Sequence, residues 1–94
     1  MSAFGPGAAG SNVALNITAA TVLKATPGVL ISVSVIVAGS AVGGVFDTTT
    51  TTPANQFGVV PIAVTTEPLV YEWRCLNGIM IVPPTGGTVA VLFV

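Results

Sequence analysis

The sequence predicts an all-β protein, a small antiparallel β-sandwich or barrel, and three observations lead to this prediction. Segments rich in Val, Ile and Thr recur at a spacing of roughly ten residues with turn signals between them, which is typical of sandwiches and barrels. Apolar side chains alternate as a pleated strand requires, and no helical stripe of useful length is present. We expect strands at about residues 12–17, 19–25, 29–38, 41–46, 56–64, 68–75, 78–83 and 88–94.

The chain is predicted to hold an extended N-terminal arm, residues 1–11, and a single β-sandwich domain, residues 12–94. The arm is Gly-rich and aperiodic. Residues 5–10 match a dinucleotide-binding fingerprint by letter, but that motif requires a preceding strand, and only four residues come before it. Alone, the arm cannot bury enough surface to offset the entropy lost when it becomes ordered. We therefore expect it to contact a neighbouring subunit through Phe4, Gly5, Pro6 and Gly7, with Phe4 as the anchor.

The longest uncharged stretch, residues 28–46, has the length of a membrane span, but its pattern favours a strand followed by glycine-containing turns. Period-two placement of β-branched residues is what a pleated strand requires. One predicted face carries Val29, Ile31, Val33, Val35 and Val37. The opposite face carries Leu30, Ser32, Ser34, Ile36 and Ala38.

The C-terminal third of the chain is predicted to be a three-stranded meander. Asn77-Gly78 between two apolar runs is a strong hairpin signal, because a type I′ turn needs positive φ at both central positions. In the preceding strand aromatic and charged residues alternate. We expect Tyr71 and Trp73 to anchor the core, with Glu72 and Arg74 pointing outward.

Charge is unusually scarce in this sequence. Two basic and three acidic residues make up 5% of the chain, against about 25% in ordinary soluble domains. A folded monomer of this size would expose roughly 5,000 Å², or about 1,000 Å² per charge. With 52% hydrophobic residues and a mean hydropathy of +0.95, we expect neighbouring subunits to cover much of that surface. Two basic residues also argue against nucleic-acid binding.

The sequence offers little material for catalysis or for a cofactor. It has no His and one Cys, so it predicts neither an intrachain disulfide nor a His/Cys zinc site. Lys24 is the only side-chain amine that could activate a nucleophile, and Glu67 and Glu72 come without a pocket signature. Cys75 is expected to be a small buried hydrophobe. We expect no enzyme activity, no catalytic residue, no metal and no cofactor.

Two stretches, residues 15–35 and residues 71–82, resemble the small, charge-poor β proteins of tailed bacteriophage virions. Together they cover about a third of the chain. Within that group the chain is most similar to capsid decoration (cement) proteins. The resemblance implies a structural protein on the capsid surface of the virion, a major capsid protein as partner, and a homotrimer. It brings no catalytic or ligand-binding motif with it.

Other functions remain open at this point. Fibre, spike and tail subunits of phage virions share the same charge-poor β character. A small host- or carbohydrate-binding module is a third alternative, although such modules present several exposed aromatic side chains and the chain has one Trp and one Tyr. A small membrane protein is the fourth. The N-terminus, Met-Ser-Ala-Phe-Gly-Pro, lacks a basic region followed by an apolar run, so we expect synthesis in the host cytoplasm.

Overall fold

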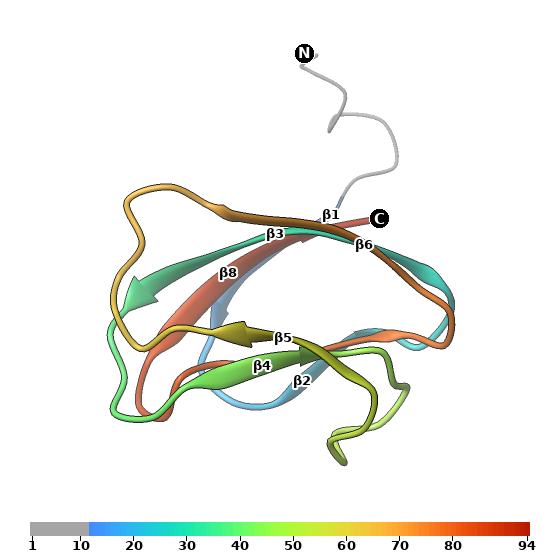
Figure 1. Cartoon of the computed structure of the whole chain (residues 1–94), viewed down its shortest axis with the longest axis horizontal. Helices are drawn as coiled ribbons and strands as arrows, with labels where there is room; N and C mark the ends of the chain where they lie inside the picture. The colour runs from blue at the N-terminus through green and yellow to red at the C-terminus, as the bar shows by residue number, and fades with distance from the viewer. Residues whose placement is uncertain (1–11) are drawn as a thin grey trace.

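The computed structural model describes residues 12–94, which form two four-stranded antiparallel sheets packed face to face (Figure 1). Sheet A has the strand order β1-β8-β3-β6 and sheet B the order β2-β7-β4-β5. The strands are β1 (Asn12–Ile17), β2 (Thr21–Lys24), β3 (Gly28–Val37), β4 (Gly43–Phe46), β5 (Gln56–Val60), β6 (Leu69–Cys75), β7 (Ile79–Val82) and β8 (Thr88–Phe93). The predicted sandwich is therefore confirmed. The predicted arm and its contact residues Phe4 to Gly7 lie outside the described residues.

The strand pairing is that of a jelly roll. The strands form four pairs: β1 with β8, β2 with β7, β3 with β6 and β4 with β5. Pairing of β3 with β8 joins two of them into sheet A, and pairing of β4 with β7 joins the other two into sheet B. All of these pairs are antiparallel, and only β4 and β5 are neighbours in both sequence and sheet. This arrangement of eight strands in two sheets is the jelly-roll form of the β-sandwich.

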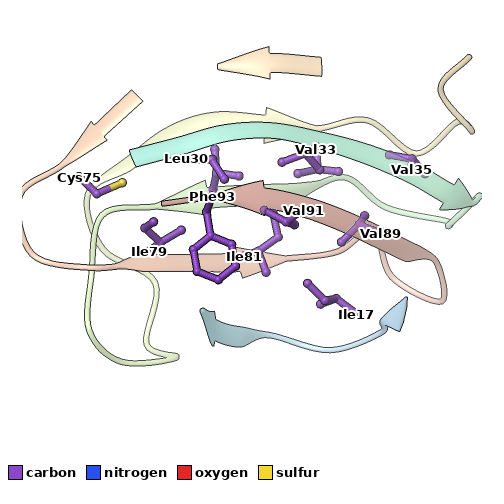
Figure 2. Packing of buried hydrophobic residues seen from close by; sticks show 12 residues of the cluster. Ile17, Leu30, Val33, Val35, Cys75, Ile79, Ile81, Val89, Val91 and Phe93 are labelled. Carbon is purple, nitrogen blue, oxygen red and sulfur yellow. The ribbon is translucent and has the colours of Figure 1, made fainter. Parts of the chain in front are cut away.

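The hydrophobic core lies between the two sheets. Its members come from the inward faces of both layers, and Figure 2 shows the side chains of β3 and β8 converging on those of β7. Burying each of these side chains contributes on the order of 2 kcal/mol. The completely or almost completely buried members are Leu30, Val33, Val35, Val45, Val60, Cys75, Ile79, Ile81, Val89 and Val91.

The predicted faces of residues 29–38 are wrong at the start of the strand. Leu30 is fully buried with Val33 and Val35, although it belongs to the opposite predicted set. The register against β8 shifts between Leu30 and Ser32, because β3 has one residue more than β8 there. This bulge at Ile31 reverses the alternation, since each inserted residue exchanges the two faces of a strand.

The predicted hairpin at Asn77-Gly78, and with it the meander, is wrong. β6 lies in sheet A and β7 in sheet B, so this turn crosses between the layers. Among the described residues, positive φ occurs at Asn16, Asn55, Glu72 and Gly86, and neither turn residue is among them. The backbone N–H groups at the crossing instead donate hydrogen bonds to the carboxylate of Asp47, which follows β4.

Candidate interaction surfaces

The outer face of sheet A carries almost no charge. β1, β3 and β8 contain no ionisable side chain, and the only charged residues of the sheet, Glu72 and Arg74, lie on its edge strand β6. Arg74 is opposite Val29, whose neighbour Leu30 is buried, so Arg74 belongs to the outer face, at one corner of it. Val13, Leu15 and Val70 are 63%, 65% and 67% exposed. Val13 and Leu15 lie on one edge strand and Val70 on the other, so their significance depends on what joins them across the sheet.

The strand register places a continuous row across this face. Val13 is opposite Leu92, Leu92 is opposite Ser32, and Ser32 is opposite Val70, so the row runs through all four strands. The small residues in the middle of the sheet leave a shallow hollow of about 210 Å³. Its lining is Val13, Ser32, Ser34, Ala90, Val91 and Leu92. We call the apolar and hydroxyl-bearing surface formed by Val13, Leu15, Ser32, Ser34, Val70, Ala90 and Leu92 the outer face of sheet A.

The outer face of sheet B differs because its own side chains cover its middle, although Val59 on its edge strand is 55% exposed. Met80 alternates with core residues of β7, so it points away from the core, yet it is fully buried. Phe46, opposite Met80, is only 7% exposed. A side chain at Gly44 would come within 3.0 Å of the Phe46 ring, so the glycine leaves the space that the ring occupies. Within residues 12–94, no side chain covers the outer face of sheet A in the same way.

A second exposed apolar surface lies at one end of the sandwich, on the left in Figure 1, where the β3–β4 and β5–β6 connections meet. The backbone N–H of Gly39 donates to the Ile62 carbonyl at 2.9 Å, and the N–H of Thr65 donates to the Val35 carbonyl at 3.1 Å. The first bond joins the two connections, and the second joins the β5–β6 connection to β3. We call this surface the apolar end, and it carries Ile36, Val37, Val42, Ile62 and Val64, which are 42–61% exposed.

An aromatic cluster closes the open side between β5 and β6. The rings of Phe57 and Trp73 stack with centroids 5.0 Å apart, and Phe57 meets Tyr71 edge to face. The Tyr71 hydroxyl donates a hydrogen bond to the Val59 carbonyl at 3.0 Å. Trp73 is 47% exposed, so its prediction as a core anchor is wrong, whereas Tyr71 packs against the core. Trp73 is opposite buried Leu30 but lies on an edge strand.

In the part of the chain that the structure describes, each of the four edge strands contains a bulge. Relative to its partner, β1 has an extra residue at Leu15-Asn16, β2 at Leu23, β5 at Phe57 and β6 at Tyr71-Glu72. In β1 and β6 the bulge includes a non-glycine residue with positive φ. Bulges interrupt the row of free backbone groups to which a further strand would bond. The edges of both sheets are therefore poor templates for strand addition.

Cys75 is buried, as predicted. It is 0% exposed, although a hollow of about 310 Å³ opens beside it near Gly28 and Arg74. Burial raises the pKa of its thiol to about 11, and the Asp47 carboxylate adds to the increase. A thiol with this pKa remains protonated at neutral pH and is a poor nucleophile. Within residues 12–94, no three His, Cys, Asp or Glu side chains gather as metal ligands would.

Comparison with known proteins places the chain in no family. No protein-family model matches it, and neither a curated protein nor a solved structure does. Over residues 12–94, no helix is long and apolar enough to cross a membrane.

Proposed function

We propose that the chain is a non-enzymatic structural subunit of a bacteriophage virion, which decorates and stabilises the capsid shell by binding across major capsid protein subunits. The observation that supports this proposal best is the presence of two separate exposed apolar surfaces on one small domain: the outer face of sheet A and the apolar end. A decoration subunit needs such a pair, because it contacts both its own copies and the shell.

The scarcity of charge supports the same proposal. A surface with five charged side chains gains little from remaining in water and loses little on desolvation when a partner covers it. Binding across several shell subunits also multiplies modest affinities, since the second contact of a linked pair forms at high effective concentration. The jelly roll occurs in viral capsid proteins and in lectins, and this analogy of fold favours a virion or a sugar-binding role without deciding between them.

Purified particles of the phage whose genome encodes the chain provide the test. Mass spectrometry should find the chain in stoichiometric proportion to the major capsid protein, and cryo-electron microscopy should place it on the outer shell. Particles without the chain should lose their contents at a lower temperature and regain stability when the purified chain is added. Deleting residues 1–10 should weaken that attachment if the arm binds the shell. Particles that contain no copy of the chain would contradict the proposal.

A small carbohydrate-binding module is the second candidate, and the exposed Trp73 favours it. The sequence places this residue in the core, but the structure leaves 47% of it accessible with its ring supported by Phe57. A supported, exposed indole is a surface on which a sugar ring can stack. Titrating the chain with oligosaccharides while following Trp fluorescence tests this function. A saturable change abolished by Trp73→Ala would favour the module over the decoration subunit.

A further inference from the structure

We propose that the outer face of sheet A pairs with the same face of a second copy, so that two chains pack sheet against sheet about a two-fold axis. This inference goes beyond the proposed function, because the pairing requires no other virion component. It assigns a partner to the surface that carries Val13, Ser32, Val70 and Leu92.

The scarcity of charge is what makes this face complementary to itself. A two-fold axis brings each residue near its own copy or near residues of the same patch, so a charged face would confront charge of the same sign. Like charges that meet across an interface weaken the contact strongly. β1, β3 and β8 present none, and Arg74 of β6 lies at one corner of the face, opposite Val29. Ser32 and Ser34 add hydroxyls that both donate and accept hydrogen bonds.

The dimensions of the face set the expected strength of the contact. The four strands of sheet A contain 29 residues, which at about 3.3 Å per residue and about 4.8 Å between strands give a face of roughly 460 Å². Two such faces would bury about 900 Å² in total, which is at the small end of protein interfaces, so we expect a weak, reversible dimer. The hollow beside Ser32 and Ala90 also gives a protruding side chain such as Val70 of a second copy a place to pack.

The alternatives within the fold are less suitable. All four edge strands are interrupted by bulges, so continuous pairing of edges between copies is disfavoured. The outer face of sheet B is covered by Phe46 and contains Met80 already buried. Two aligned sheets pack well at a separation of about 10 Å, as they do within this sandwich. Face-to-face pairing predicts a dimer, in place of the trimer that the phage resemblance implies.

Sedimentation velocity of the purified full chain at concentrations up to hundreds of micromolar tests the pairing and should show a dimer that dissociates on dilution. Val13→Glu and Val70→Glu each introduce two carboxylates into a two-fold interface and should weaken the dimer about tenfold or more. Val42→Glu is the matched control, since Val42 is 61% exposed but lies at the apolar end, and it should leave the dimer intact. A monomeric wild-type chain, or equal weakening by all three substitutions, would overturn the inference.

A cross-linking experiment keeps the test decisive if a Glu variant fails to fold. Ser32→Cys places an accessible thiol in the middle of the face, while Cys75 is buried. A short bis-maleimide should link two Ser32→Cys chains efficiently and should link two Val42→Cys chains poorly. Equal yields for the two variants would contradict the pairing.

If the chain is monomeric and dimerises only after residues 1–10 are deleted, its own N-terminal segment covers the face and the inference is wrong. None of these outcomes depends on whether the chain is found in virions.

Discussion

The Oδ1 atom of Asp47 accepts a hydrogen bond of 2.8 Å from the backbone N–H of Asn77, thirty residues further along the chain. The same carboxylate accepts the N–H of Leu76 at 2.9 Å and that of Gly78 at 3.3 Å. One side chain thus accepts hydrogen bonds from three consecutive backbone N–H groups in the connection from β6 to β7. These bonds attach the connection, which passes from sheet A to sheet B, to the residue that follows β4.

Replacing this carboxylate should destabilise the domain. Asp47→Ala leaves three backbone N–H groups dependent on water, and we expect the free energy of unfolding to fall by about 1–2 kcal/mol, since the site is partly exposed. Urea denaturation followed by Trp fluorescence measures the change. Thr50→Ala, in the exposed part of the same loop, is the control and should change stability by less than about 0.5 kcal/mol. Equal effects of the two substitutions would show that the Asp47 hydrogen bonds contribute nothing.

The stability should also depend on pH through this residue. Burial by itself would raise the pKa of Asp47, but the backbone hydrogen bonds from Leu76, Asn77 and Gly78 outweigh it and hold the pKa below the ordinary 3.8. A lowered pKa in the folded chain contributes stability that is complete above pH 3.8 and is lost as the pH falls through the folded value. Wild type should therefore lose stability below about pH 4 more steeply than Asp47→Asn. Parallel profiles for the two proteins would contradict this assignment.

The burial of Cys75 predicts its reactivity. Desolvation and the nearby Asp47 charge raise the pKa of the thiol to about 11, and the side chain is inaccessible in the folded domain. Iodoacetamide at pH 8 should label the folded chain very slowly and the denatured chain rapidly. Mass spectrometry of timed samples gives both rates. Similar labelling rates in the two states would mean that the end of β6, where Cys75 lies, unfolds locally often enough to expose the thiol.

The positions of the strands along the sequence were predictable, because they depend on the pattern of neighbouring residues. Each of the eight strands overlaps its predicted segment, and most ends agree to within a residue. The largest difference is in β5, which ends at Val60 although the prediction runs to residue 64. Their pairing was not predictable in the same way. The Asn77-Gly78 signal describes a turn, but Asp47, thirty residues earlier, satisfies the backbone there and lets the chain cross to the other sheet. Bulges at Ile31 and Glu72 also exchange faces, and one inserted residue leaves no clear trace in an apolar sequence.

The candidate interaction surface was only partly predictable. The scarcity of charge indicated a covered surface, but it could not indicate which one, because charge is scarce in every segment. The structure singles out Val13 and Val70 by bringing the first and sixth strands into one sheet with β8 and β3 between them. Trp73 is exposed for a related reason: its strand ends up at an edge, which the alternation within that strand does not reveal.

The exposure of Trp73 can be checked directly by fluorescence. Its indole is 47% exposed, so acrylamide should quench it substantially in the folded chain. Trp73→Phe should cost less than about 1.5 kcal/mol, because an aromatic ring still stacks on Phe57. Leu30→Ala, directly opposite and fully buried, should cost about 2–5 kcal/mol. A folded state in which acrylamide does not quench Trp73 would place this side chain in the core after all.

Two glycines allow a final test of the packing between β4 and β7. A side chain at Gly43 would overlap the Val82 carbonyl oxygen and lie 2.7 Å from the Pro83 carbonyl carbon, both rigid backbone atoms. Because β4 lies between β5 and β7, it cannot shift away without breaking a ladder, and Gly43→Ala should cost more than about 3 kcal/mol. Gly86 has φ of +78° and no atom within 4 Å of an added Cβ, so Gly86→Ala carries only backbone strain of about 1 kcal/mol. Thermal and urea denaturation should therefore show a much larger loss of stability for Gly43→Ala than for Gly86→Ala. If Gly43→Ala is as stable as Gly86→Ala, the close approach of β4 to the β7–β8 connection is not part of the folded protein.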